Sequence, residues 1–323
     1  MLARIAHELY WLGRNVARAE HTIRMVEGIY QADLQGRPDD PAGVTLSWAA
    51  LLAIMGASGV IVDGDPARTR ERALAALASD QSSPVSVMSC VTRAREGART
   101  VRDVISTEMW ETINTFHLGF GANREAVTLQ SGPYPLATYV KGRCALFWGV
   151  AARTMLRDEA HAFLEAGGRF ESADMVLRML RVALPPGGES GDGSPLRDGQ
   201  ALALLQAVGG LQAYRRAVPA PPNAAPVARF LLFTRSYPDS VAASVEAVGA
   251  ALSAADANPR SSEPVLRLSR LSADLEFRGG AAGNDGELLE VCEIVGRELA
   301  LTDRDITDRY FGGTPAAEHF YSH

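Results

Sequence analysis

The chain has 323 residues, of which 47% are hydrophobic and 22% charged, a balance typical of globular proteins that excludes disordered and fibrous classes. A formal net charge of −6 argues against proteins that hold nucleic acid or acidic lipid headgroups through surplus basic residues. We therefore expect no nucleic-acid partner and no membrane partner, and a length that allows one large domain or two packed halves.

Apolar residues recur at helical spacing along nearly the whole chain. Between residues 2 and 30 they fall at steps of three and four, which predicts a long amphipathic helix with a charged opposite face. No segment alternates with a period of two for long enough to predict a strand, so the expected fold class is all-α. The same helical spacing predicts further helices at 45–57, 66–79, 84–118, 136–182, 198–217, 226–234, 239–255, 263–277 and 286–309. Segments rich in Gly, Pro, Asp and Ser predict loops at 36–43, 119–135, 185–199, 218–226 and 278–286, and an irregular tail at 312–323.

An internal repeat relates the two halves of the chain. Sliding the sequence against itself by 154 residues aligns equal residues in three separate segments. The aligned pairs include Met1 with Met155, Leu2 with Leu156, Gly13 with Gly167, Arg24 with Arg178, and Pro84 with Pro238. The constant offset predicts two homologous helical halves, 1–154 and 155–311, packed about a pseudo-twofold axis. A functional site is expected at the seam between them, where pockets form between helices.

The cysteines and the missing motifs limit the possible chemistry. The three cysteines have no CxxC spacing, which predicts neither a disulfide framework nor a zinc ribbon. Charged residues within 1–30 interrupt any signal-peptide core, so we expect a cytoplasmic protein. Phosphate loops, nucleophile elbows and zinc-binding helices have no counterpart in the sequence, and we therefore expect no cofactor and no metal.

Two polar helices aligned by the repeat are the candidates for chemistry. In the first, Glu20 and Arg24 share one face, and in the second Glu171, Asp174 and Arg178 do so. Each face is either a solvated ladder of ion pairs or a charged site turned inward.

Three blocks of sequence resemble a known family. They are Tyr10-Trp11-Leu12-Gly13-Arg14 with Arg18-Ala19-Glu20, then Glu108-Met109-Trp110-Glu111-Thr112-Ile113-Asn114, and finally Met155-Leu156-Arg157-Asp158-Glu159 with Glu171-Ser172-Ala173-Asp174. In this order they resemble the bacterial Alpha-E family, an all-helical family, over about residues 1–311. Its members are typically encoded beside, or fused to, circularly permuted ATP-grasp proteins and transglutaminase-like peptidases. The resemblance implies such partners and a role in making or modifying an amide bond, but assigns no reaction to the helical protein itself.

The Glu-Arg motif that names the family is divided between the two helices. The first helix has Ala17-Arg18 and the second has Glu171-Ser172, so each half has lost a different member of the pair. Arg18 and Glu171 would form one charged pair if the two helices meet at the seam. The alternative is that the site has decayed and the protein serves as a scaffold.

Three functions stay open at this point. The first is a partner that binds an ATP-grasp ligase or presents an acidic or amino substrate to it. The second is a stand-alone enzyme in which Glu171 is the general base and Arg18, Arg24 and Arg178 bind a carboxylate or phosphate. The third is a scaffold, with a homo-oligomer also open. An enzyme requires a buried pocket lined by these side chains, whereas a partner requires an exposed apolar patch. Five further polar residues are candidates for substrate binding: Glu20, Glu108, Arg157, Asp158 and Asp174.

Overall fold

The computed structural model of the protein describes residues 1–34, 47–57, 66–125, 132–183, 195–281 and 285–312. These ranges contain helices and no strand, so the predicted all-α class is confirmed. No helix within them is both long and apolar enough to cross a membrane. The α-helices are α1 (Ala3–Leu34), α2 (Trp48–Ile54), α3 (Pro66–Leu74), α4 (Val87–Thr100), α5 (Thr107–Glu125), α6 (Tyr134–Thr154), α7 (Glu159–Ala183), α8 (Pro195–Ala207), α9 (Leu211–Ala217), α10 (Ala224–Phe233), α11 (Val241–Ala255), α12 (Glu263–Ala281) and α13 (Asp285–Tyr310). The predicted loop at 36–43 and all but the first residue of the predicted tail at 312–323 lie outside the described residues.

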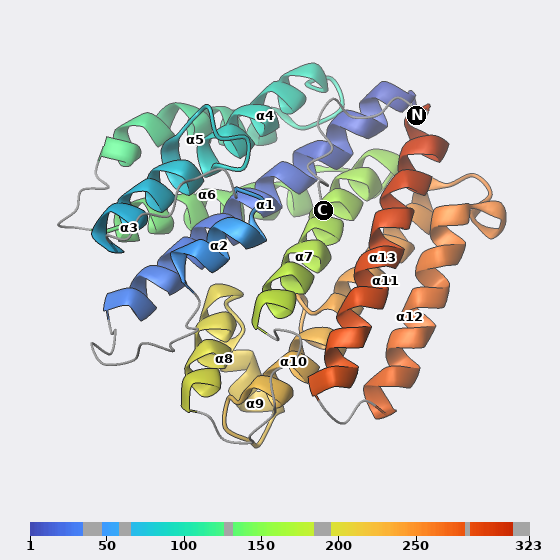
Figure 1. Cartoon of the computed structure of the whole chain (residues 1–323). Coiled ribbons are helices and arrows are strands. Elements are labelled where there is room, and N and C mark those ends of the chain that lie inside the picture. The colour runs from blue at the N-terminus through green and yellow to red at the C-terminus, as the bar shows by residue number, and fades with distance from the viewer. Residues whose placement is uncertain (35–46, 58–65, 126–131, 184–194, 282–284, 313–323) are drawn as a thin grey trace.

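Two long helices, α1 and α7, lie side by side through the centre of the molecule (Figure 1). α1 also packs against α4 and α6, while α7 packs against α11 and α13. In the outer layers, α5 lies between α4 and α6 in the same way that α12 lies between α11 and α13. Figure 1 shows the first group on one side of the central pair and the second group on the other. Each central helix therefore has a matching set of neighbours.

Two glycines allow α1 and α7 to approach closely. A Cβ on Gly13 would lie 2.1 Å from the carbonyl oxygen of Leu164, and one on Gly167 would lie 1.9 Å from the carbonyl oxygen of Tyr10. Any larger residue would push the two backbones apart, since packed interiors leave no such space. Gly13 and Gly167 are 154 residues apart, as are Tyr10 and Leu164. The contact is therefore reciprocal under the sequence offset, as isologous contacts are.

Matching helices also begin with the same cap. The Ser86 hydroxyl accepts a hydrogen bond from the Ser89 amide at the start of α4, at 3.1 Å. The Ser240 hydroxyl accepts one from the Ala243 amide at the start of α11, also at 3.1 Å. Serine is a favoured N-cap because its hydroxyl satisfies an amide that the first helical turn leaves without a partner. The two capping serines are 154 residues apart.

Three predicted helices are divided in the structure. The segment 84–118 forms α4 and α5 with a break at 101–106, and the segment 136–182 forms α6 and α7 with a break at 155–158. Neither break contains Gly or Pro, so the sequence carries no strong signal for it. The segment 198–217 is divided into α8 and α9 close to Gly209, whose φ of +72° does not continue a helix.

Some predicted loops are shorter than expected. α5 continues to Glu125 and α12 to Ala281, both inside segments predicted as loops. The glycines of these segments therefore lie in helical turns. Glycine lowers the stability of a helix but does not prevent one that tertiary packing stabilises.

Candidate functional site

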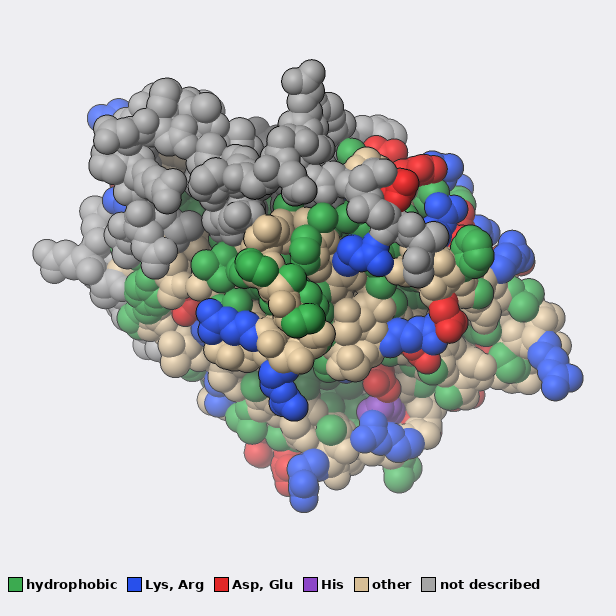
Figure 2. All heavy atoms as spheres, turned by 90° about the horizontal axis from the view of Figure 1, so that it is seen from below, with side chains coloured by type: hydrophobic (Ala, Val, Ile, Leu, Met, Phe, Trp, Pro, Cys, Tyr) green, Lys and Arg blue, Asp and Glu red, His purple; other side chains and the backbone are tan. Residues whose placement is uncertain are grey.

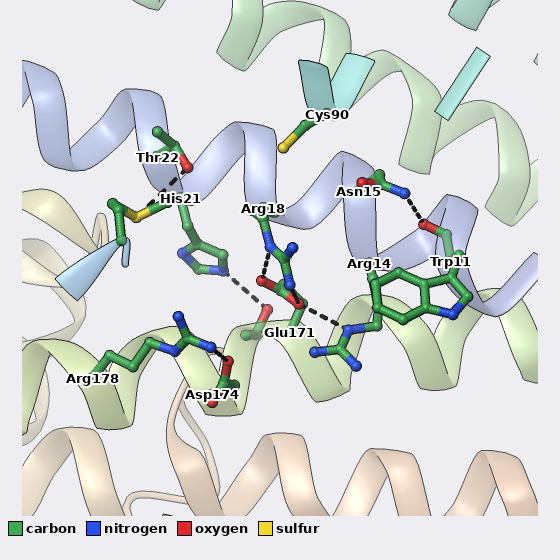
Figure 3. Close-up of polar contacts among 12 residues, drawn as sticks. Trp11, Arg14, Asn15, Arg18, His21, Thr22, Cys90, Glu171, Asp174 and Arg178 are labelled. Atoms are coloured by element: carbon green, nitrogen blue, oxygen red, sulfur yellow. Dashed lines mark hydrogen bonds and ion pairs between the residues drawn. The ribbon is translucent and has the colours of Figure 1, made fainter. Parts of the chain in front are cut away.

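Arg18 of α1 and Glu171 of α7 form a buried ion pair where the two helices cross (Figure 3). Nε of Arg18 donates to Oε1 of Glu171 at 2.5 Å, and Nη2 donates to Oε2 at 2.8 Å. Two parallel hydrogen bonds of this kind give strong and geometrically specific pairing. The Glu171 side chain is 0% exposed. The predicted contact between the divided members of the Glu-Arg motif is confirmed.

Arg14 brings a second guanidinium to the same carboxylate. Its Nε donates to Oε2 of Glu171 at 2.9 Å, and its Nη1 donates to Asp303 of α13 at 2.7 Å. The Trp11 and Phe170 rings lie 4.7 and 4.8 Å from this guanidinium, within the range of cation–π attraction. The hydroxyl of a neighbouring tyrosine also donates to Asp303, at 3.1 Å. We call Tyr10, Arg14, Arg18, Glu171 and Asp303 the buried cluster.

The buried cluster keeps Glu171 ionised and inaccessible. Burial by itself would raise the pKa of Glu171, but the charges of Arg18 and Arg14 and the hydrogen bond from Arg18 outweigh burial and hold that pKa well below its usual range. A general base has to reach the substrate and take up a proton near the working pH. This geometry instead makes Glu171 an anchor that ties α1 to α7, with Arg14 extending the link to α13.

Three members of the buried cluster, Tyr10, Arg14 and Asp303, were not predicted as site residues from the sequence. Arg14 lies one helical turn before Arg18 and within the quoted Tyr10-Trp11-Leu12-Gly13-Arg14 block, so helical spacing alone could have indicated it. Asp303 comes from a helix near the end of the chain, and no sequence pattern connects it to α1.

A cavity of about 510 Å³ opens between α1, α6, α7 and the segment preceding α11. Its volume lies within the range of small-molecule sites. Its polar lining comes from Glu20, His21, Arg24, Arg157, His161, Glu165, Arg169, Ser172 and Asp239. Its apolar lining comes mainly from Ala17, Trp148, Ala151, Ala152, Leu164, Gly168 and Pro238. We call this cavity the mixed-charge pocket.

Two ion pairs within the mixed-charge pocket are internal to the protein. Arg24 donates to Glu20 one turn earlier, at 2.7 and 3.0 Å. Arg169 lies 3.7 Å from Asp239 and donates to a nearby backbone carbonyl. These four charged side chains therefore compensate one another in pairs.

The predicted site residues are divided among several places. Arg18 and Glu171 join the buried cluster, whereas Glu20, Arg24 and Arg157 line the mixed-charge pocket. Asp174 and Arg178 pair at 2.8 Å further along α7, as Figure 3 shows. The Asp158 side chain accepts hydrogen bonds from the Ala160 and His161 amides, so it caps α7. Glu108 is exposed on α5 and is not among the residues that line the mixed-charge pocket.

Within the described ranges, neither a reactive cysteine nor a metal site is found. Cys90, Cys144 and Cys292 are buried, and burial raises the pKa of each thiol, that of Cys292 to about 12. A thiol with a raised pKa is a poor nucleophile at neutral pH. Across the described residues, no three His, Cys, Asp or Glu side chains gather as a metal site.

Comparison with protein families finds one family model that matches most of the chain. The Alpha-E family model, described as "A predicted alpha-helical domain with a conserved ER motif", matches residues 1–311. Comparison with curated proteins and with solved structures gave no match.

Proposed function

Because the chain belongs to the Alpha-E family, we propose that it is the substrate-presenting partner of an ATP-grasp amide ligase. The observation that carries this proposal is the mixed-charge pocket between the central helices. The substrates of an amide ligase carry a carboxylate and an amine, and a pocket that contains both arginines and carboxylates can bind groups of either charge. A transglutaminase-like protein is a second proposed partner.

A ligase partner was expected to expose an apolar patch, but the described surface exposes few large apolar side chains, so the proposed partnership rests on the mixed-charge pocket instead. Among the described residues, the exposed large apolar side chains lie on α5, α6 and α12 and just before α1 and α7, namely Met1, Leu2, Leu118, Leu146, Leu156, Leu266 and Phe277. Single exposed apolar residues are common, whereas docking faces usually present several hundred Å² of continuous apolar surface. On the face drawn in Figure 2, side chains of the hydrophobic class, which there includes Ala and Pro, gather near the centre of the view, with basic and acidic side chains around them.

The enzyme alternative lacks an accessible base at Glu171. Both oxygens of that carboxylate accept hydrogen bonds from arginines, and the side chain is 0% exposed. Its lowered pKa also makes proton uptake at neutral pH unfavourable. The mixed-charge pocket therefore supports binding and presentation better than catalysis by the Glu-Arg pair.

We also infer that the chain consists of two homologous halves, 1–154 and 155–311, related by a pseudo-twofold axis along the central helices. The reciprocal contacts of Gly13 and Gly167 support this relation. The caps at Ser86 and Ser240 and the matching neighbours of α1 and α7 support it as well. The buried free thiols fit a reducing, cytoplasmic setting.

The proposed partnership is tested by reconstitution with the ATP-grasp protein that the proposal expects beside this gene. We expect co-elution of the two proteins, and ADP release with amide product only when both are present. Arg24→Gln in the mixed-charge pocket should slow product formation, whereas Arg304→Gln on the exposed face of α13 serves as the matched control. Equal product formation by the ligase alone, without co-elution, would contradict the proposal.

A further inference from the structure

The buried cluster and the mixed-charge pocket occupy equivalent positions under the 154-residue offset. Four residues of the buried cluster, together with the adjacent Trp11, correspond to residues of the other half: Tyr10, Trp11, Arg14, Arg18 and Glu171 to Leu164, Glu165, Gly168, Ser172 and Ala17. All five of these equivalents line the mixed-charge pocket. At these equivalent positions beside the central helices, long side chains fill the space in the buried cluster, which we call the filled version. In the mixed-charge pocket a cavity remains, which we call the hollow version.

The hollow version carries small side chains where the filled version carries long ones. Gly168 and Ser172 replace two arginines, and Ala17 replaces a glutamate, at buried positions of α1 and α7. Trp148 of α6 fills part of the space, because a Cβ on Gly168 would lie only 2.5 Å from the edge of its ring. The remaining volume is open to a ligand that brings its own charged groups.

Two charged side chains of the pocket have no oppositely charged partner among the described residues. Arg157 donates to Nε2 of His161 and to a backbone carbonyl, and no carboxylate lies within ion-pair distance of it there. Glu165 lies 3.7 Å from Nδ1 of the same histidine. Since an arginine always donates, Nε2 of His161 accepts and Nδ1 carries the proton. Burial and the Arg157 charge lower the pKa of His161, so the imidazole between the two charges is neutral at neutral pH.

A buried polar atom in the same pocket also lacks a partner. Nδ1 of His21 has no hydrogen bond, although the residue is only 5% exposed, while its Nε2 pairs with the Ser172 hydroxyl at 3.1 Å. Buried polar atoms almost always have a partner, so an exception at a cavity indicates a group that the ligand or water supplies.

We propose that the mixed-charge pocket binds a free α-amino acid, with its carboxylate at Arg157, its ammonium at Glu165 and its side chain against Trp148. A cation and a carboxylate on either side of one neutral imidazole match the two ends of a zwitterion. The apolar wall of Trp148, Ala151 and Leu164 favours an apolar side chain. The inference rests on the proposed function only in using the same pocket, and it names the ligand class.

Calorimetric titration of the full chain tests the inference without any ligase. The probe is L-phenylalanine, and its methyl ester and N-acetyl derivative remove the carboxylate charge and the ammonium charge respectively. We expect saturable binding of the amino acid, with each derivative binding at least about tenfold more weakly, because a hydrogen bond to a charged group contributes this much or more. No saturable binding, or equal binding of all three compounds, would overturn the inference.

Single variants assign each end of the ligand. Arg157→Gln should remove the preference for the acid over the ester, and Glu165→Gln should remove the preference for the amine over the N-acetyl compound. Arg260→Gln, at an exposed arginine far along the chain, is the control and should keep both preferences. Unchanged preferences in both pocket variants would place the ligand elsewhere.

Refilling the pocket gives an independent test. Ala17→Glu and Ser172→Arg would each bury a lone charge and lower the melting temperature. Together they recreate a Glu-Arg pair, so the double variant should regain much of the lost melting temperature yet fail to bind L-phenylalanine. A folded double variant that binds as the wild type does would refute the pocket as the site. If the double variant does not fold, the ester and N-acetyl preferences decide the matter.

The two proposals fail separately. Loss of the expected L-phenylalanine binding with intact ligase reconstitution would remove only the amino-acid assignment. Intact binding with no effect on any ATP-grasp ligase would remove only the proposed partnership.

Discussion

The buried cluster and the mixed-charge pocket lie against the same two helices but have opposite characters. In the buried cluster the charged groups hydrogen-bond one another, and Arg14 is only 1% exposed. In the mixed-charge pocket the equivalent positions carry small residues, and a cavity of about 510 Å³ remains. The comparison indicates that small side chains at a few positions along two packed helices leave a cavity, whereas long charged side chains at the positions 154 residues away fill the corresponding space.

The buried cluster connects α1 and α7, two of the helices that line the pocket. Glu171 and Asp303 connect α1 with α7 and α13 through Arg14. A buried ion pair adds little stability over apolar packing, but breaking one by removing a partner is costly, so it fixes one arrangement of the helices. Rigid supporting helices are what a preorganised binding site needs.

The largest expected effect is on the free energy of unfolding, which should fall far more for a change in the buried cluster than for one in the pocket. Arg14→Ala removes a guanidinium from two buried carboxylates, and we expect unfolding to become easier by about 3–5 kcal/mol. Arg157→Ala in the exposed part of the pocket should stay within about 0.5 kcal/mol of wild type. Urea unfolding of both variants measures the difference. Equal losses would show that the buried cluster is no more structural than the pocket.

The second prediction concerns the helix crossing itself. Gly13→Ala and Gly167→Ala each place a Cβ against a carbonyl oxygen of the facing helix, and we expect losses of about 3 kcal/mol, the upper end for overpacking. Because the two contacts are reciprocal, the losses should be similar. Thermal melts of the two variants and of Gly142→Ala, where a Cβ meets nothing within 4 Å, provide the comparison. A large loss at only one of the two glycines would break the proposed pseudo-symmetry.

The third prediction isolates the divided Glu-Arg pair. A double-mutant cycle on Arg18→Ala and Glu171→Ala should give a coupling energy of about 2 kcal/mol, within the range for residues that share a buried network. The measurement is urea unfolding of the wild type, the two single variants and the double variant. Additive losses would mean that Arg14 alone holds the carboxylate.

Much of the fold and one contact of the site could be predicted from the sequence. Helical spacing gave the all-α class, and the repeat offset combined with the family's motif brought Arg18 and Glu171 together. That success depends on facing helices that carry the two members at equivalent positions. The breaks at 101–106 and 155–158 were missed because neither contains Gly or Pro, although each closes with a residue that caps the following helix, Ser106 for α5 and Asp158 for α7.

The pocket could not be predicted from the sequence alone. A cavity is an absence of side chains in a particular place, and Gly168, Ser172 and Ala17 are unremarkable residues in a helix. That they leave a cavity becomes clear only when they are compared with their equivalents in the buried cluster, Arg14, Arg18 and Glu171. Asp303 was missed for a similar reason, since only the folded chain brings α13 to Arg14.

The fourth prediction uses acid to weaken the buried cluster. The folded-state pKa of Glu171 lies below its ordinary value of about 4.3, so its contribution to stability is complete above that value and is lost as the pH falls through the folded-state pKa. Asp80 and Asp256 have lowered pKa values too and act with the same sign. The difference in unfolding free energy between wild type and Glu171→Gln isolates Glu171. This difference should shrink steadily below about pH 4, and a constant difference would show that Glu171 carries no pKa shift.

The smallest expected effect distinguishes two equivalent arginines. Arg24 and Arg178 each pair with an acidic residue one turn earlier, and their side chains are 31% and 24% exposed. Such half-exposed pairs contribute little, so we expect each Arg→Ala change to cost about 0.5–1 kcal/mol. Arg178→Ala should lie at the upper end, because Arg178 also donates to the Ile54 carbonyl of α2 at 3.4 Å.

For ligand binding, in contrast to stability, we expect the larger effect from the change at Arg24. Arg24 lines the mixed-charge pocket, whereas Arg178 is not among its lining residues. Arg24→Ala frees the Glu20 carboxylate inside the pocket and should therefore weaken L-phenylalanine binding, while Arg178→Ala leaves it unchanged. Thermal melts and calorimetric titration of both variants test the two halves of this statement. Melting temperatures equal to that of the wild type would show that neither arginine contributes to stability. Equal L-phenylalanine affinities of the two variants would show that Arg24 has no role in binding that Arg178 lacks.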